Sequence, residues 1–297
     1  MITRRALSFL LLPACSLCAQ TPANTPPVLA EPPGEADYQK AYGLYRLQSV
    51  AHPGDPTAAF KPCMKAAKAG HPLAMVLLGN FYQWGDGVRE DEDESRRWNQ
   101  KALPGVKILA ESGRTDAQAH YAFLLSSALG IAPDLSAALV WYRKAADGGE
   151  ISAWGSLGGF YERGKGTPKD IAEARHCYEE GARRGDPGSL WSLGRLDLMG
   201  GPGTPANPEK ACQNFTAAAG MGLGVAALQI GDQYIQGVGV PKDLIEAGKW
   251  LYIAERLGDG AARIIFAMEI SGKIPTADEK EAVRRAKEWL RAKGRAD

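Results

Sequence analysis

The chain has 297 residues, enough for two ordinary domains or for one extended array of repeats. Apolar residues make up 45% and charged residues 23%, which excludes a chain that is disordered throughout. Because 35 basic side chains balance 34 acidic ones, no net charge attracts nucleic acid, and nucleic-acid binding is not expected.

The first 19 residues have the pattern of an export signal. Arg4 and Arg5 are followed by the short apolar run 6–12 and then by small residues. The run is too short to span a bilayer, so no transmembrane segment is expected. We predict a signal peptide at 1–19 and a periplasmic or secreted product. The alternative is a membrane-anchored lipoprotein, because the sequence before Cys15 resembles a lipoprotein box.

Residues 20–33 are rich in proline and almost free of large apolar side chains. This composition is typical of an extended linker, and we predict that the segment is disordered.

From residue 34 onward, glycine recurs at a nearly fixed interval. The intervals are 36, 43, 36, 36, 37, 36 and 36 residues, between Gly34, Gly70, Gly113, Gly149, Gly185, Gly222, Gly258 and Gly294. Each interval holds two stretches with apolar residues at helical spacing. We call these glycines the anchor glycines. They define seven predicted repeats, at 34–69, 70–112, 113–148, 149–184, 185–221, 222–257 and 258–294.

Small residues recur in the first helical stretch of each repeat. Nine positions after the anchors stand Gly43, Gly79, Ala122, Gly158, Gly194, Gly231 and Ala267. Glycine costs roughly 1 kcal/mol against alanine inside a helix, so a close helix crossing is the physical reason to expect it there.

The second helical stretch of each repeat is preceded by a capping residue. Aspartate or asparagine, the preferred N-caps, stands at Asp55, Asp91, Asp134, Asp170, Asn207, Asp243 and Asp278. Glu281 would complete a capping box with Asp278. Glycine pairs such as Gly237 and Gly239 predict tight hairpin turns before these caps.

The 43-residue interval carries seven extra residues after Trp98. Seven residues are two helical turns, so an elongated second helix keeps its apolar face in register. Pro104 predicts a kink within it. A period near 36 with two helices per unit indicates an all-α solenoid of about seven helix-turn-helix repeats.

The motif residues of two repeats carry a family resemblance. Leu78, Gly79, Tyr82, Gly85 and Asp91 stand in the spacing that recurs from 226 to 243, and 141–149 supplies the second half of the motif. This pattern resembles the Sel-one-like repeat, over about 34–294, although tyrosine is missing at Leu125, Asp197 and Ile270. The resemblance implies a right-handed superhelix, related to tetratricopeptide arrays, that acts as a protein adaptor. A cysteine-rich branch has two cysteines per repeat. No repeat of this chain has two cysteines, so the properties of that branch are not expected here.

No motif for catalysis, a cofactor or a metal is present in the sequence. The four histidines lack metal-binding spacing, and we expect His71, next to an anchor glycine, to be exposed. Cys177 and Cys212 fall on second helices of neighbouring repeats. They are expected to be small packed residues, with a disulfide between them as the alternative.

By analogy with tetratricopeptide superhelices, the first helices would line a concave groove. Positions 6, 10, 13 and 14 after the anchors select Gln48, Asn80, Gln83, Trp84, Glu162, Arg163, Trp191, Arg195, Asp232 and Gln236. Such side chains suit a peptide or helix, because tryptophan and arginine dominate interface hot spots. The alternative is that Trp84 and Trp191 pack within the superhelix.

Our hypothesis is therefore an exported, non-enzymatic scaffold that binds a protein or peptide in its groove. Two other functions stay open at this point. One is a cell-wall-associated protein, either a hydrolase or a binder of peptidoglycan fragments, and the other is a secreted effector that acts on a host.

Overall fold

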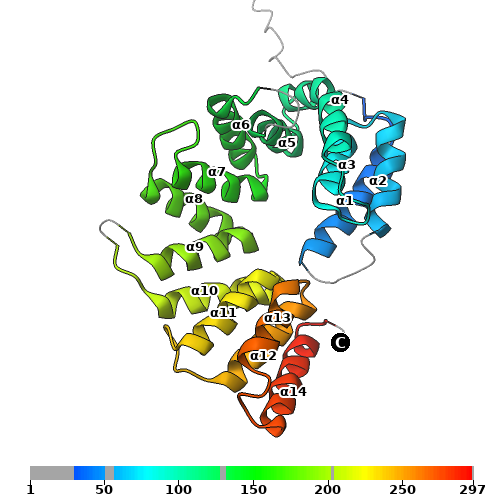
Figure 1. Cartoon of the computed structure of the whole chain (residues 1–297). Coiled ribbons are helices and arrows are strands. Elements are labelled where there is room, and N and C mark those ends of the chain that lie inside the picture. The colour runs from blue at the N-terminus through cyan, green and yellow to red at the C-terminus, as the bar shows by residue number, and fades with distance from the viewer. Residues whose placement is uncertain (1–29, 51–56, 128–131, 202–203, 296–297) are drawn as a thin grey trace, which may run out of the picture.

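The computed structural model describes residues 30–50, 57–127, 132–201 and 204–295. The predicted signal peptide, Cys15 and all but the end of the proline-rich linker lie outside these ranges. Within them the structure consists of fourteen α-helices and contains no β-strand (Figure 1). The helices are α1 (Glu35–Val50), α2 (Thr57–Ala69), α3 (Pro72–Trp84), α4 (Glu92–Glu111), α5 (Thr115–Ser126), α6 (Leu135–Asp147), α7 (Ile151–Arg163), α8 (Ile171–Arg183), α9 (Pro187–Met199), α10 (Pro208–Gly220), α11 (Gly224–Gln236), α12 (Leu244–Arg256), α13 (Gly260–Glu269) and α14 (Thr276–Ala292).

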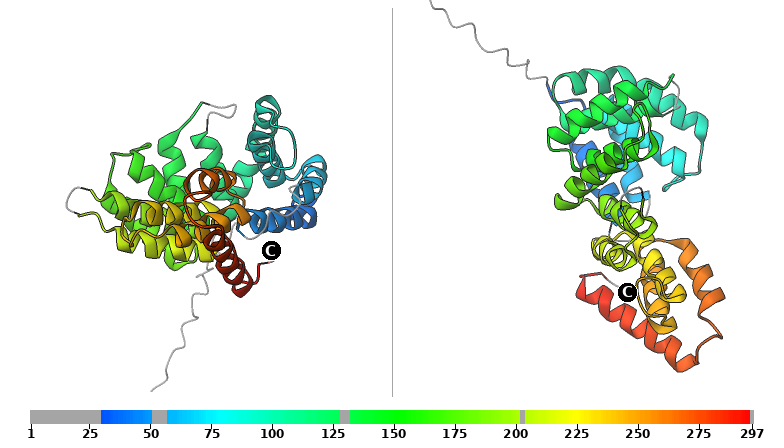
Figure 2. Two further views of the ribbon diagram at one scale, coloured as in Figure 1. Left: turned by 60° about the horizontal axis from the view of Figure 1, so that its bottom comes forward. Right: turned by 90° about the vertical axis from the view of Figure 1, so that its left-hand side faces the viewer.

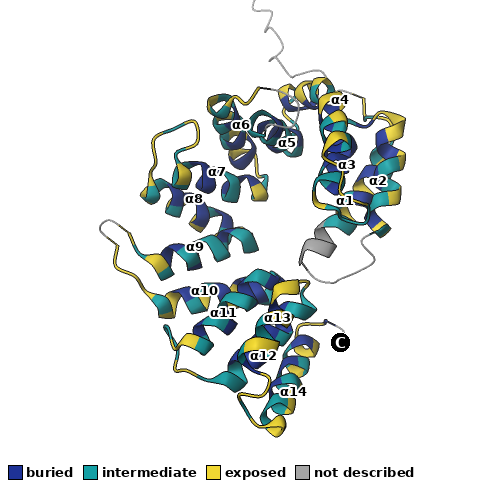
Figure 3. Cartoon of the chain, viewed as in Figure 1, coloured by how far each residue is buried: buried dark blue, intermediate teal, exposed yellow. Residues whose placement is uncertain are grey.

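The helices form seven successive pairs, and nearly every helix packs against its neighbours in sequence. The stacked pairs curve around a common centre, so the first and last pairs approach each other across it (Figure 1). Buried residues run along the contacts between helices (Figure 3). The predicted α-solenoid of about seven helix pairs is confirmed, and we number its units 1 to 7.

The anchor glycines separate the units. All eight have a positive φ, from 70° at Gly294 to 108° at Gly222. Each except Gly34 follows the C-terminal end of a second helix, where the left-handed conformation lets the chain reverse and glycine carries no Cβ penalty. The regular glycine spacing in the sequence therefore reflects the left-handed backbone conformation that every turn between units requires.

The predicted N-caps are confirmed for the second helices of units 2 to 6. The side chains of Asp91, Asp134, Asp170, Asn207 and Asp243 each accept a backbone N–H from the first turn of the following helix.

The caps predicted for the two terminal units are not confirmed. Asp55 lies outside the described residues. The prediction for Asp278 is wrong, because α14 already begins at Thr276, behind Pro275. Asp278 instead lies in the first turn, and Glu281 binds Arg284 and Arg285 in place of closing a capping box.

Close helix crossings are present in the middle of the array. A Cβ added to Gly158 would lie 2.5 Å from the Tyr178 ring, and one on Gly194 would lie 2.5 Å from Phe215. The prediction is wrong at the two ends, where Gly43 and Ala267 are exposed. No atom lies within 4 Å of where a Cβ on Gly43 would be, so no close helix crossing forms there.

The elongated second helix of unit 2 is confirmed. Helix α4 has 20 residues, against 13 in each of α6, α8, α10 and α12. Pro104 lies inside it without ending it, and Gly105 packs against Pro72.

The last unit departs from the pattern of the others. Helix α14 packs on α12 and leaves α13 at the side of the array, as the right-hand view of Figure 2 shows. Ala267 is exposed for this reason, and the side chains of Ile264 and Met268 are 60% and 65% exposed. Arg295 is buried and donates hydrogen bonds to the carbonyls of Ala219 and Gly220, at 3.4 Å each.

Candidate functional site

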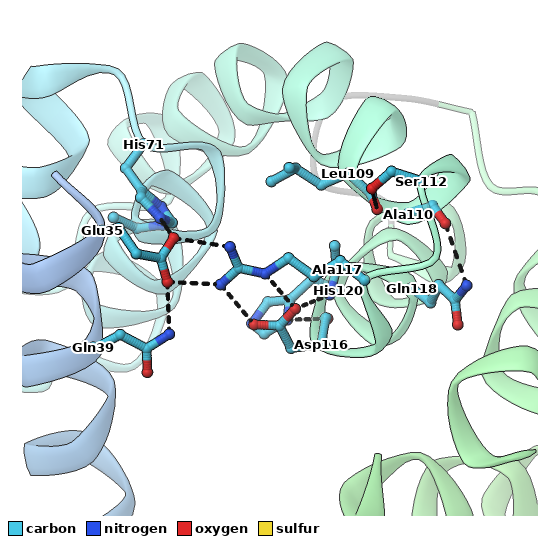
Figure 4. Close-up of polar contacts among 12 residues, drawn as sticks. Glu35, Gln39, His71, Leu109, Ala110, Ser112, Asp116, Ala117, Gln118 and His120 are labelled. Carbon is cyan, nitrogen blue, oxygen red and sulfur yellow. Dashed lines mark hydrogen bonds and ion pairs between the residues drawn. The ribbon is translucent and has the colours of Figure 1, made fainter. Parts of the chain in front are cut away.

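The residue after an anchor glycine is the N-cap of the first helix in most units, and in units 1 to 3 these residues are joined. Arg114 donates two hydrogen bonds to the Glu35 carboxylate, at 2.8 and 3.0 Å, and two to Asp116, at 2.8 and 3.0 Å. His71 lies 2.9 Å from the same Glu35 carboxylate (Figure 4). We call Glu35, His71, Arg114 and Asp116 the polar network. It fastens unit 1 to unit 3 across 79 residues of sequence.

His71 is fully buried, so the expectation that it is exposed is wrong. Its Nδ1 accepts the backbone N–H of Ala74, and its Nε2 therefore donates to Glu35. The Tyr38 ring stacks on the imidazole at 4.4 Å between centroids. The turn position is covered because unit 1 packs over the start of α3.

The polar network shifts the pKa values of its members. Hydrogen bonds from Arg114 lower the pKa of Glu35 to about 2, against the opposing effect of burial. Burial lowers the pKa of His71, although the neighbouring Glu35 raises it. A charged Glu35 and a neutral His71 fit the observed hydrogen bonds, and the four side chains act as a structural fastening.

The curvature of the array creates a cavity between its beginning and its middle. Tyr42 and Tyr45 of α1 form one wall, and the turns that lead into α7, α9 and α11 form the other, with a volume of about 440 Å³. We call this cavity the central pocket. Its lining residues are Tyr42, Tyr45, Gly149, Glu150, Ile151, Ser152, Gly185, Asp186, Pro187 and Leu223.

The two walls of the central pocket differ in chemistry. Tyr42 stacks on Tyr38 with 5.7 Å between ring centroids, and Tyr45 and Phe81 form a T-shaped pair at 5.5 Å. Opposite them, Glu150 and Asp186 cap α7 and α9. An enclosure of this size with aromatic, apolar and charged walls can hold several residues of a polypeptide.

Nine of the ten residues selected from sequence lie in the second half of a first helix, Trp191 lies nearer the start of α9, and none of the ten lines the central pocket. Glu162, Arg163, Trp191 and Arg195 come together on α7 and α9. Arg195 binds Glu162 at 2.9 Å, and its guanidinium lies 5.0 Å from the Trp191 ring.

Two of the selected residues border a second cavity, which lies between α7 and α9. Glu162, Arg163 and Met199 line this cavity of about 450 Å³. The Glu162 carboxylate also accepts the Tyr178 hydroxyl at 2.7 Å.

The other selected residues are distributed over three helices. Trp84 is 67% exposed at the end of α3, with the half-buried Asn80 and Gln83 before it. Asp232 and Gln236 lie on α11, where burial and the nearby Asp259 raise the pKa of Asp232. Gln48 lies in α1, but its side chain is outside the described residues.

The residues of the central pocket and the polar network were not selected from the sequence. All the selected positions except Trp191 lie late in the first helices, whereas both features use the residue directly after an anchor glycine. The repeated placement of polar residues there, in Glu35, His71, Arg114, Glu150 and Asp186, was a signal that could have found them. Their meeting with Tyr42 and Tyr45 depends on the curvature of the whole array, which no local pattern encodes.

Several other features bear on function. Cys63, Cys177 and Cys212 are free thiols, and burial raises the pKa of Cys177 to about 11. In the described ranges, no group of three histidine, cysteine or acidic side chains could hold a metal ion. No helix in those ranges is both long and apolar enough to cross a membrane.

The sequence model of the Sel1 repeat matches the chain five times, at residues 72–103, 115–150, 156–186, 187–223 and 224–259. A Sel1 repeat protein from Oxalobacter formigenes has a similar solved structure, with 26% identity, a TM-score of 0.52, and coverage of 86% of this chain and 96% of that one. A protective antigen of uropathogenic Escherichia coli with an SLR fold has 25% identity and a TM-score of 0.50, over 89% of this chain and 55% of that one.

Two regulators are similar in sequence. The chitin synthase regulator SKT5 of Saccharomyces cerevisiae is 30% identical over 178 residues, which cover 57% of this chain and 25% of the relative. An exopolysaccharide production negative regulator of Rhizobium meliloti is 30% identical over 149 residues, covering 46% and 56%. The match thus spans only a quarter to about half of the length of these relatives.

Proposed function

The chain belongs to the Sel1 repeat family, and from this premise we propose that it is a non-enzymatic adaptor that binds a segment of a partner protein in the central pocket. The observation that carries the proposal is the pocket itself, which joins α1 to three turns more than 100 residues further along the chain. An array of stacked helix pairs offers an extended curved surface for this purpose. The two regulators that are similar in sequence are consistent with such a role.

We further propose that the adaptor is exported, on the basis of the charged start and apolar run at 1–12. Mass spectrometry of the mature N-terminus in cell fractions tests this directly. A chain that begins after residue 19 supports a signal peptide, and a lipid-modified Cys15 supports the anchored alternative. A cytoplasmic chain that retains Arg4 and Arg5 would contradict export.

The central pocket can be tested by filling it. Ser152 lines the pocket and is exposed, so Ser152→Trp adds bulk inside it. The change also removes the hydrogen bond that the Ser152 hydroxyl donates to Glu150 at 2.7 Å, and Ser152→Ala controls for that loss. Partners are first identified by crosslinking in living cells and purification, and their affinity is then measured with the purified proteins. We expect Ser152→Trp to weaken binding at least tenfold, or by roughly 1.4 kcal/mol.

The control is Ser136→Trp, which adds the same bulk at an exposed position of α6 outside the pocket lining. If Ser152→Trp bound every identified partner as tightly as this control, the pocket would not be the binding site. Co-sedimentation with purified peptidoglycan tests the cell-wall alternative, which predicts binding without any protein partner.

The surface predicted from sequence remains a separate proposal for the same adaptor function. Trp84→Ala and Arg195→Ala test it, with affinity for the same purified partner as the measurement. Arg195 is the stronger test, because it contacts Trp191 and its ion pair holds Glu162, which lines the cavity between α7 and α9. Unchanged affinity in both variants would reject that surface and leave the central pocket unaffected.

A further inference from the structure

The central pocket has an uneven distribution of charge, and this suggests which residue of a partner it takes. Glu150 and Asp186 form its charged wall. Among the described residues, no lysine, arginine or histidine side chain lies within ion-pair distance of either carboxylate. In units 1 to 3, by contrast, Glu35 is neutralised by Arg114 within the polar network.

The cations closest in sequence to this wall are already bound elsewhere. Arg184 precedes the anchor glycine of unit 5, but its guanidinium pairs with Glu180 and lies 4.9 Å from the Trp154 ring. Arg183, beside it, pairs with the same Glu180, and Lys144, the nearest cation before Glu150, lies 4.2 Å from the Trp141 ring. None of these three side chains pairs with Glu150 or Asp186.

The helix ends supply only part of the missing positive charge. One oxygen of Glu150 accepts the backbone N–H and the hydroxyl of Ser152, and one oxygen of Asp186 accepts the backbone N–H and the hydroxyl of Ser189. A helix N-terminus carries roughly half an elementary positive charge, so each carboxylate retains a negative excess. The wall formed by Glu150 and Asp186 therefore keeps a net negative charge after the positive ends of α7 and α9 are taken into account.

The opposite wall favours a cation as well. Tyr42 and Tyr45 line it with aromatic side chains, a residue type whose π system attracts ammonium and guanidinium groups. Ile151, Pro187 and Leu223 add apolar surface for the methylene groups of a long side chain. Carboxylates on one side and tyrosines on the other thus complement a lysine or arginine side chain.

We propose that the central pocket selects a partner segment by a lysine or arginine side chain, which lies between Tyr42 and Tyr45 on one wall and Glu150 and Asp186 on the other. This inference rests on the proposed function, because it names the residue that the bound segment must carry. It does not depend on which protein supplies the segment.

The test uses the full chain and peptides selected from a random phage-displayed library. The sequences that depend on the pocket are those that bind the unmodified chain but do not bind the Ser152→Trp variant. Their affinity is measured as synthetic peptides at low and high salt, with the basic residue retained or replaced by norleucine. We expect these peptides to carry a lysine or arginine and norleucine to weaken binding roughly tenfold, an effect that shrinks as salt is raised.

Glu150→Gln and Asp186→Asn test the wall of the pocket. Both replacements keep an oxygen that can cap the helix while they remove the charge. We expect each to weaken binding of the lysine or arginine peptides and to leave the norleucine peptides unchanged. Asp170→Asn is the matched control, because Asp170 caps α8 outside the pocket in the same way.

The outcomes separate the inference from the proposed function. Peptides that depend on the pocket but bind equally well with norleucine, or to the two neutralised variants, would overturn the charge selection and leave the adaptor proposal standing. A selection that yields no peptide sensitive to Ser152→Trp would overturn both.

Discussion

A single glutamate, Glu35, connects three repeat units at the start of this array. Arg114 follows the anchor glycine of unit 3, and its planar guanidinium spans the carboxylates of Glu35 and Asp116. Lysine could not make four hydrogen bonds in this fork geometry. Since His71 donates to the same Glu35 carboxylate, the first residues of units 1, 2 and 3 form one connected group.

The polar network predicts a loss of stability in acid. The folded chain keeps Glu35 charged to about pH 2, whereas the unfolded chain takes up this proton near pH 4.5. Its contribution is therefore complete above pH 4.5 and is lost as pH falls toward 2, by roughly 3 kcal/mol in total. The lowered pKa of His71 acts in the same direction, because protonation below about pH 6.5 favours the unfolded chain.

Glu35→Gln tests this contribution in denaturant unfolding at pH 7, 5 and 3. We expect the free energy of unfolding to fall by about 2 kcal/mol at pH 7 and its decline between pH 5 and 3 to become shallower. Asp93→Asn is the control, since its pair with Arg96 is exposed and should contribute less than about 0.5 kcal/mol. An equally steep acid decline in Glu35→Gln would show that other groups cause it.

At the scale of the helix, the same small residue has opposite roles at different places in the array. Gly158 of α7 faces the buried Tyr178 ring, and an added Cβ would lie 2.5 Å from it. Gly43 stands at the equivalent position of α1, but no atom lies within 4 Å of where its Cβ would be. The neighbouring helix therefore decides the effect of a substitution that looks identical in sequence.

This difference predicts effects of opposite sign for glycine-to-alanine substitutions. We expect Gly158→Ala to destabilise the chain by about 1 to 3 kcal/mol, because the rigid ring must shift. Gly43→Ala should stabilise it by roughly 0.5 to 1 kcal/mol through helix propensity alone. Thermal and denaturant unfolding measure both. Stabilisation by Gly158→Ala would mean that α7 and α8 are less closely packed than the structure shows.

The limits of prediction from sequence follow from the same point. The period, the turns and the caps from Asp91 to Asp243 could be predicted, because each depends on the local chain and recurs in every inner unit. Asp278, Gly43 and Ala267 were predicted wrongly, because they lie in units that lack a neighbour or pack differently. The central pocket forms only because six units curve together. The sequence positions of Tyr42 and Asp186 therefore did not predict that both would line one cavity.

Across the whole molecule, contacts between distant units are few and lie near its two ends. Most contacts join helices that follow each other in the chain, as expected for a repeat array. The polar network ties unit 1 to unit 3, and Arg295 ties the end of unit 7 to α10 of unit 5. Both connections reinforce terminal units, which have a neighbour on one side only.

Arg295→Ala should therefore loosen the end of the array without unfolding its middle. The guanidinium binds two carbonyls at the C-terminal end of α10, where a cation is also favoured by the helix dipole. We expect the amides of α14 to exchange with solvent about tenfold faster, as for a loss of roughly 1.4 kcal/mol in local stability.

Hydrogen exchange read by mass spectrometry distinguishes this local effect from a global one. Amides of α7 and α8 should keep their rates, and Arg284→Ala, which changes an exposed side chain of the same helix, should leave α14 unaffected. If α7 and α8 accelerated together with α14, the array would open as one cooperative unit. In that case the stability of the central pocket would depend directly on Arg295, although the two lie in different parts of the molecule.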